Sequence, residues 1–598
     1  MSSPPFHNAS HSYGRLTALT PQPDPNPQTR PKTRPLLRCL ATLTILLLLL
    51  ATATAATSLI MKWRSQHGSD RAIKPTKVIS QLCGSAWYQN LCVESLLGFP
   101  GAMKASGDEL VHISVNVTLM KFGKALDLSM QIGYLEMGSL GRSAYEDCLE
   151  LLDHSVDLLT RSLSSVQSKQ GGTNMDVMTW LAAAVTNQDT CMEGIDGISG
   201  PARDHLAETM KDLSEMGSNS LAIFANTRKG GGNDVEHEGM IGNRRRRLLG
   251  LVPKSNGFDH PIWFTRRDRI LLATPSSQIQ ADVIVSQGGQ NGTVKTILEA
   301  INMAPVMSNR RFIIHVTAGR YVEKNLKIGR KKTNLWLVGD GRGQTVISGD
   351  RSVAHDLITT FRTASFAATG TGFVAKDITF ENSAGPGEHQ AVALRVGADH
   401  AVVYRCEIKG YQDTLYVHNQ RQFYRECDIY GTVDFIFGNA AVVFQNCTMY
   451  AIKPLPLQKI TITAQNRKDP QMCTGISIHA CQIKATSDLE LVKSSFPTYL
   501  GRPWKPFSRV VYMLSYIGDH VDPRGWLEWN ATAPVDKLYY GEYSNYGPSA
   551  SIQQRVKWPG LHANMSVSEA SAFTVEQFIF GSAWLSSTGV AFQAGLSG

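Results

Sequence analysis

The sequence lacks the motifs that would explain its positive charge by nucleic-acid binding. Its 598 residues carry a net charge of +9, which favours acidic partners, yet they contain no zinc-finger spacing and no aromatic-basic RNA-binding motif. The Gly-x-Ser-x-Gly turn of serine esterases is also missing. No group of His and Cys residues has the spacing of zinc ligands. We therefore expect an acidic polysaccharide as the partner, no nucleic acid, no metal and no cofactor.

Charge is missing altogether from residues 39–61, an apolar run long enough to cross about 30 Å of hydrocarbon as a helix. Residues 1–38 are rich in Pro, Ser and Thr, the composition of a disordered tail. Basic residues before an apolar run keep such a tail in the cytosol. We expect a transmembrane signal anchor, with a cleaved signal peptide as the alternative. Either one exports the chain that follows Lys62.

Features of exported proteins follow this run. All cysteines except Cys39 lie beyond it, where an oxidising lumen permits disulfides. Asn-x-Ser/Thr triplets are candidate glycosylation sites, and they begin at Asn116, Asn291, Asn446, Asn530 and Asn564. We expect a precursor held in the membrane of the secretory pathway and a product outside the cell.

Helical periodicity marks the first of at least two domains, which a chain of 598 residues requires. Apolar residues recur at three- and four-residue steps between Tyr145 and Leu163, which predicts one face of an amphipathic helix. Further helical runs occupy residues 176–192 and 205–225. We expect residues 76–228 to form an all-α, antiparallel four-helix bundle.

Cysteines and short motifs in this region resemble a known family. Tyr145-Glu-Asp-Cys148 and Thr179-Trp-Leu-Ala-Ala-Ala184, together with Cys83, Cys92 and Cys191, are similar to the plant invertase and pectin methylesterase inhibitor domain. The resemblance implies the disulfides Cys83–Cys92 and Cys148–Cys191. It also implies that the bundle docks on a target enzyme.

A repeat of about 20 residues organises the second domain. Cys406-Glu-Ile, Cys427-Asp-Ile and Cys447-Thr-Met each follow a short apolar strand, and the pattern returns less regularly at Cys481. Stacked strands with this period favour a right-handed parallel β-helix, which we expect over residues 276–598. Asp413 follows Cys406 at the same spacing as Asp434 follows Cys427. The two carboxylates should therefore lie on adjacent coils, roughly 5–6 Å apart.

Two stacked carboxylates cannot both ionise freely, so one should keep its proton while the other stays an anion. Such a pair can supply a general acid and a nucleophile. Aspartates that merely end strands of a solenoid are the alternative, and the neighbouring motifs argue against it. They are Tyr411-Gln-Asp-Thr-Leu-Tyr416, Gly431-Thr-Val-Asp-Phe-Ile-Phe-Gly-Asn439, Gly385-Pro-Gly-Glu-His-Gln-Ala-Val-Ala393 and Leu500-Gly-Arg-Pro-Trp504.

These motifs closely resemble those of plant pectin methylesterases. The resemblance implies a pectinesterase that hydrolyses methyl esters of cell-wall homogalacturonan, with Asp434 as the nucleophile and Asp413 as the acid and base. It makes Gln390 and Gln412 the oxyanion hole. It also implies that Thr360, Gln390, Arg502 and Trp504 bind the substrate, methylesterified homogalacturonan.

The resemblance bears on cysteines and processing as well. It suggests a Cys427–Cys447 disulfide, while the states of Cys406, Cys473 and Cys481 stay open. Precursors of this family are cleaved at Arg-Arg-Leu-Leu-like sites, so we expect a subtilisin-like protease to cut the linker, residues 229–275. Arg246, Arg247, Leu248 and Leu249 form the favoured site, and residues 266–272 form the second candidate.

Rival functions remain to be weighed. A polygalacturonase would also use carboxylates, and a pectate lyase would need a calcium-binding cluster, but the glutamine pair fits acyl transfer better. A catalytically silent wall-binding or inhibitor protein is the alternative to an enzyme. We expect secretion to the cell wall, and docking of the bundle on its own esterase domain as a form of autoinhibition; assistance in folding or retention is the alternative role of the bundle.

Overall fold

The structure is a computed structural model that describes residues 74–168, 172–229, 278–289 and 294–596. The expected anchor at 39–61, both linker cleavage sites and Asn291 lie outside the described residues. Within the described ranges, no helix is long and apolar enough to span a membrane. Residues 75–598 belong to a single unit by their internal contacts.

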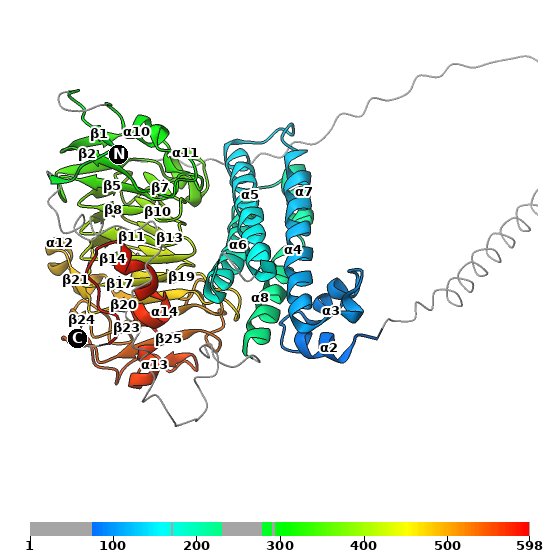
Figure 1. Ribbon diagram of the computed structural model, residues 1–598. Helices are drawn as coiled ribbons and strands as arrows, with labels where there is room; N and C mark the ends of the chain where they lie inside the picture. Colours follow the sequence, from blue (N-terminus) through cyan, green and yellow to red (C-terminus); the bar gives the residue numbers. More distant parts are fainter. Residues whose placement is uncertain (1–73, 169–171, 230–277, 290–293, 597–598) are drawn as a thin grey trace, which may run out of the picture. The chain divides into compact units, whose positions relative to one another are not determined.

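The helical region contains seven α-helices within the described residues (Figure 1): α2 (Lys77–Cys83), α3 (Gln89–Leu97), α4 (Gly107–Met130), α5 (Ser139–Ser168), α6 (Asn174–Asp196), α7 (Pro201–Thr209) and α8 (Leu213–Lys229). The four longest, α4, α5, α6 and α8, pack on one another, as the apolar periodicity predicts. Capping boxes at Ser106 and Thr173 fix where α4 and α6 begin. The predicted four-helix bundle is confirmed.

Both disulfides predicted for the bundle are present. Cys83–Cys92 joins α2 to α3 across a Cα–Cα distance of 5.7 Å, and Cys148–Cys191 joins α5 to α6 across 4.7 Å. The second bond ties together the two helices that pack most extensively.

The second region consists of parallel strands stacked as coils (Figure 1). The 11-stranded sheet contains β1 (Val283–Val285), β2 (Phe312–Val316), β5 (Leu335–Gly339), β8 (Val374–Lys376), β11 (Ala401–Tyr404), β14 (Arg421–Arg425), β17 (Ala441–Gln445), β20 (Gly475–His479), β23 (Arg509–Met513), β25 (Tyr539–Tyr543) and β26 (Leu561–His562). The 7-stranded sheet contains β4 (Leu326–Ile328), β7 (Phe366–Ala368), β10 (Leu394–Val396), β13 (Leu415–Val417), β16 (Ile436–Gly438), β19 (Ile460–Gln465) and β22 (Thr498–Gly501). The 8-stranded sheet contains β3 (Gly319–Val322), β6 (Thr345–Gly349), β9 (Thr379–Asn382), β12 (Glu407–Lys409), β15 (Asp428–Gly431), β18 (Thr448–Ala451), β21 (Gln482–Ala485) and β24 (Tyr516–Ile517).

The central coils each contribute one strand to each sheet, so equivalent side chains stack in ladders. Ile408, Ile429, Met449 and Ile483 occupy one such position and are fully buried. The expected parallel β-helix is thereby confirmed.

Short helices lie on the outside of the coils or in the loops between strands. They are α10 (Ile297–Met303), α11 (Val353–Asp356), α12 (Ser487–Glu490), α13 (Val567–Ser571), α14 (Val575–Phe578), α15 (Gly581–Trp584), and the 3-10 helices η3 (Thr360–Arg362) and η4 (Lys493–Ser495). The last three α-helices pack on the outer face of the 11-stranded sheet.

The predicted Cys427–Cys447 disulfide is wrong, because the structure has both residues as free, buried thiols. They lie with Cys406 and Cys481 in a ladder that enters the core. The Cys427 amide donates to the Cys447 sulfur at 3.4 Å, so the two residues are neighbours on adjacent coils without being bonded. The Cys427 sulfur instead donates to the Arg425 carbonyl at 3.4 Å, and the Cys447 sulfur donates to the Gln445 carbonyl at 3.5 Å. Cys473 is also free.

Candidate active site

Asp413 and Asp434 lie at equivalent positions of adjacent coils. Each comes two residues before a strand of the 7-stranded sheet, and the register pairs Leu415 with Ile436. The Asp413 amide donates to the Val433 carbonyl at 3.0 Å. Both aspartates have left-handed backbone conformations, with φ of 61° and 53°, which cost energy in non-glycine residues and are concentrated at functional sites. The predicted stacking is confirmed.

Asp434 is bound by the guanidinium of Arg502 and by a threonine hydroxyl. Arg502 donates from Nε to Asp434 Oδ1 at 2.8 Å and from its second terminal nitrogen to Oδ2 at 2.6 Å. Thr461 Oγ1 donates to Asp434 Oδ1 at 2.6 Å and accepts from the Asp434 amide at 2.9 Å. A bidentate guanidinium is the strongest partner that a carboxylate finds in proteins. The guanidinium therefore fixes the orientation of the Asp434 carboxylate in the cavity.

Asp413 has a different environment, although only one coil separates the two residues. Burial and the neighbouring Asp434 charge raise the pKa of Asp413 well above its usual value, and the Arg502 charge only partly opposes them. Among the described residues, no hydrogen-bond donor reaches its side chain. The carboxyl group of Asp413 is therefore kept in the protonated form, ready to donate.

A cavity of about 490 Å³ contains the predicted site residues together. Its lining includes Thr360, Gln390, Gln412, Asp413, Asp434, Arg502 and Trp504. Gln390 and Gln412 come from adjacent coils, since the Ala391 amide donates to the Gln412 carbonyl at 3.2 Å. Within the described part of the chain, neither side-chain amide has a hydrogen-bond partner. Two free N–H donors therefore face the same cavity as the aspartates.

Aromatic rings form one side of the cavity. The Trp504 ring lies 6.1 Å from Phe437 and 6.3 Å from Trp529, measured between centroids. Phe437 stacks on Tyr416 at 4.2 Å. The guanidinium of Arg502 lies 4.4 Å from the Trp529 ring centre. A half-exposed ring such as Trp504 offers a flat apolar face to a sugar.

The sequence argument missed Thr461, Trp529, Tyr416 and Phe437. Tyr416 and Phe437 follow the two aspartates at the same spacing, so the repeat that located the aspartates could have indicated them. Thr461 and Trp529 carry no comparable signal, because the loops around them break the period.

Bundle residues also line the cavity, and the sequence did not indicate which. Asp147 from α5 is buried, and its Oδ1 accepts from Arg362 Nε at 2.6 Å. Burial raises the pKa of Asp147 to about 6. From α6, Thr190 bonds to His418 Nε2 at 2.9 Å, and Glu193 pairs with Lys505 at 2.8 Å.

The candidate glycosylation sites differ in exposure. Asn446, Asn530 and Asn564 are exposed, whereas Asn116 is half-buried within α4. The exposed three are the better acceptors for a bulky glycan.

In chemical terms, the cavity offers a carboxylate bound by a guanidinium, a second carboxyl group with a raised pKa beside it, and two side-chain amides. This set fits acyl transfer at an ester. Within the described residues, the groups of side chains that could bind a metal lie outside this cavity. One of them consists of Asp176, Asp399 and His400, and both of its aspartates already pair with the Arg421 guanidinium.

Comparisons with known proteins agree with this geometry. Residues 282–582 match the family described as Pectinesterase, and residues 77–223 match the family described as Plant invertase/pectin methylesterase inhibitor. The chain is 60% identical over 528 residues to the "Probable pectinesterase/pectinesterase inhibitor 61" of Arabidopsis thaliana, covering 88% of each protein. It is 46% identical to the "Pectinesterase/pectinesterase inhibitor PPE8B" of Prunus persica, over 76% of this chain and 83% of the relative.

A solved structure titled "Pectin methylesterase from Carrot" is similar to the second region. It aligns with a TM-score of 0.52 and 49% identity, covering 53% of this chain and 99% of the carrot chain.

Proposed function

Since the chain belongs to the pectinesterase family of carboxylic ester hydrolases that act on pectin, we propose that Asp434 and Asp413 carry out its hydrolysis of methyl esters. The observation that carries this proposal is the unequal environment of the two stacked aspartates. Arg502 binds Asp434 through two hydrogen bonds, while burial and the neighbouring Asp434 raise the pKa of Asp413.

The first half-reaction forms an acyl-enzyme. An Asp434 oxygen attacks the ester carbonyl of a methylated galacturonate, and negative charge develops on the carbonyl oxygen. The amides of Gln390 and Gln412 donate to that oxygen, and preorganised donors stabilise it better than water does. Asp413 gives its proton to the departing methoxide, which leaves as methanol. An anhydride between Asp434 and the sugar carboxyl remains.

The second half-reaction reverses the role of Asp413, which is now an anion. Its carboxylate takes a proton from a water molecule, and the hydroxide attacks the sugar carbonyl. Asp434 leaves as a carboxylate beside Arg502, Asp413 is protonated again, and the polymer keeps a free carboxyl group. Thr360 and Trp504 hold the sugar chain against the cavity wall.

Release of methanol from highly methylated pectin tests these roles. We expect the native chain, with its linker cut, to release methanol, and both Asp434→Asn and Asp413→Asn to lose nearly all activity while remaining folded. A folded native chain that releases none would favour the silent wall-binding or inhibitor protein. Undiminished release by either variant would place the chemistry elsewhere.

We also propose that the bundle docks on the esterase region of its own chain and blocks the cavity until the linker is cut. The support is the arrangement of charge. Ion pairs between the two regions have the carboxylate on the bundle and the cation on the coils: Glu146 and Asp147 with Arg362, Glu150 with Lys327, Asp153 with Arg330, Asp176 with Arg421, Asp189 with Lys468, and Glu193 with Lys505.

The cations that pair with the bundle also bear on how the substrate binds. Cations beside the cavity suit the carboxylates of demethylated pectin, and the bundle presents carboxylates to the same cations. Bundle and polymer would therefore compete for one surface. Equal activity of the uncut and cut chains would exclude autoinhibition.

We also propose a route by which the precursor matures. Residues 39–61 would anchor a precursor in the secretory pathway, a subtilisin-like protease would cut after Arg247, and the esterase would reach the cell wall. The support is the uncharged run, the Arg-Arg-Leu-Leu sequence and the exposed Asn446, Asn530 and Asn564. Mass spectrometry of the wall-bound product should find an N-terminus near Leu248 and glycans on these asparagines; an N-terminus near Ile270 would favour the second site.

A further inference from the structure

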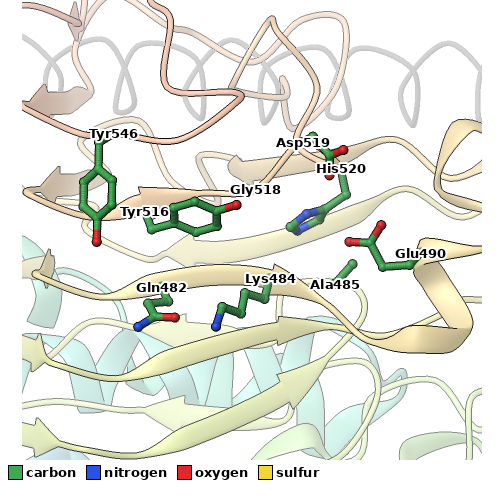
Figure 2. A pocket seen from close by; sticks show the side chains of 9 residues that line it. All are labelled: Gln482, Lys484, Ala485, Glu490, Tyr516, Gly518, Asp519, His520 and Tyr546. Atoms are coloured by element: carbon green, nitrogen blue, oxygen red, sulfur yellow. The ribbon is translucent and has the colours of Figure 1, made fainter.

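A second pocket lies on the side of the 8-stranded sheet, and it shares no lining residue with the catalytic cavity. Its volume is about 480 Å³. Residues from β21, from β24 and from the turn after β24 line it, with Glu490 at the end of α12 (Figure 2). At one end of the pocket, Glu490, Asp519 and His520 lie together.

These three side chains place one potential ligand atom each within 4.8 Å of the others. Two different segments supply them, α12 and the turn after β24. Backbone hydrogen bonds fix the turn, since the Gly518 amide donates to Ile483 at 3.0 Å and the Val521 amide donates to Gly518 at 3.2 Å. The grouping is therefore set by the stacking of coils rather than by a mobile surface loop.

His520 is the unusual member of the group. Its side chain is 5% exposed, and neither ring nitrogen has a hydrogen-bond partner among the described residues. A neutral imidazole has one donor and one acceptor nitrogen, and leaving a buried polar group unpaired costs free energy. A ligand at the acceptor nitrogen would offset part of this cost.

The position beside His520 already attracts a cation. Lys493 places Nζ 2.7 Å from Glu490 Oε2 and 2.6 Å from Asp519 Oδ2. Both carboxylates are partly exposed, with side-chain exposures of 42% and 54%, so they can shift by the small distance that metal coordination requires. A divalent ion would replace one positive charge by two and would add a bond to the imidazole of His520, which Lys493 leaves without a partner.

We propose that Glu490, Asp519 and His520 bind a divalent transition-metal ion of the zinc class, in competition with Lys493. One imidazole and two carboxylates suit zinc, at ligand distances of about 2.0–2.2 Å. Calcium takes oxygen ligands alone, so His520 selects against it. A water molecule from the pocket completes the coordination. The ion joins the segment of α12 to the next coil, and its role is to stabilise the coils rather than to take part in ester hydrolysis.

Calorimetric titration of the chelator-treated, full chain with zinc chloride tests the proposal. We expect Lys493→Met to bind zinc at least tenfold more tightly than the native chain, because the competing ammonium is gone. Glu490→Gln and His520→Ala should bind at least tenfold more weakly. His562→Ala removes a histidine that stacks on Tyr539 far from the group, and it should bind as the native chain does. Calcium chloride should bind at least tenfold more weakly than zinc to Lys493→Met.

Thermal unfolding gives an independent readout. Zinc should raise the Tm of the native chain and raise that of Lys493→Met further, but leave that of Glu490→Gln unchanged. Because Glu490 is exposed, this variant keeps the test valid even if His520→Ala fails to fold. Absence of zinc binding by Lys493→Met, native-like binding by Glu490→Gln, or equal affinity for calcium and zinc would each overturn the proposal.

Discussion

The bundle and the coils use acidic residues in opposite ways. In the coils, two carboxylates on adjacent coils line a cavity, where Arg502 binds one and burial raises the pKa of the other. In the bundle, carboxylates of α5 and α6 pair with lysines and arginines of the coils. In the proposed function, the first arrangement supplies chemistry, and the second supplies the affinity of docking. Changes in the coils should therefore alter turnover in cut and uncut chains alike, whereas changes in the bundle should alter only the uncut chain.

After the two aspartates themselves, the largest effect is expected from the two glutamines. Gln412→Ala and Gln390→Ala each remove a donor to the developing oxyanion, which lowers kcat by about 10²–10³-fold. Methanol release at saturating pectin measures this, before and after the linker is cut. Gln482→Ala, which removes a half-buried glutamine outside the cavity, is the control. If KM rises while kcat stays unchanged, the amides bind the substrate without stabilising the transition state.

Trp504 should affect binding more than turnover. Trp504→Ala removes the flat face for a sugar ring, a contact worth about 0.5–1.5 kcal/mol beyond its buried area, so KM should rise roughly tenfold. Trp504→Phe keeps a ring and should recover part of the affinity. Initial rates over a range of pectin concentrations separate the two parameters. An unchanged KM in Trp504→Ala would place the sugar elsewhere.

Glu150 tests the bundle side of the comparison. Glu150→Gln removes the partner of Lys327, whose Nζ lies 2.5 Å from Glu150 Oε1. Because this pair is partly exposed, we expect about 1 kcal/mol of docking free energy to be lost, or roughly a fivefold rise in the activity of the uncut chain. The cut chain should not change. Asp157→Asn, on the same helix but paired with Arg161, is the matched control, and an equal rise there would contradict specific docking.

The smallest effect concerns stability. The pKa of Asp413 is raised in the folded chain, well above the ordinary 3.8. Folded and unfolded states both hold this proton at about pH 3, but at higher pH the folded state resists losing it, so the ionisation lowers stability. Asparagine has no proton to lose. Asp413→Asn should therefore raise Tm by at least about 2 °C at roughly pH 9 and by less at about pH 4.

Calorimetric melting curves at both pH values measure this difference. A shift of the same size at both would mean that packing, and not charge, separates the variant from the native chain.

The sequence predicts the positions of functional residues better in the coils than in the bundle, and the reason is physical. In the coils, spacing along the chain becomes stacking in space, so the repeat at Cys406 and Cys427 locates Asp413 and Asp434 on adjacent coils. The same ladder misled the disulfide prediction, because Cys427 and Cys447 are neighbours on adjacent coils but remain free, buried thiols. Thr461 and Trp529 lie where long loops interrupt the period.

In the bundle, periodicity predicts the helices and the resemblance implies the disulfides, but neither tells which carboxylates meet the coils. Glu150 and Asp147 on α5 find their partners through the packing of two separate folds. The metal-ligand group is likewise invisible in the sequence, since Glu490 and His520 come together only when successive coils stack.

The division of labour between the aspartates can be tested directly with a substrate that needs no acid, a trigalacturonate 4-nitrophenyl ester. Asp413→Asn should release nitrophenol in a burst of about one equivalent, because Asp434 still attacks and the good leaving group departs unprotonated. The burst should then stop, because no base activates water. Asp434→Asn should show no burst. A burst from Asp434→Asn, or none from folded Asp413→Asn, would contradict the assigned roles.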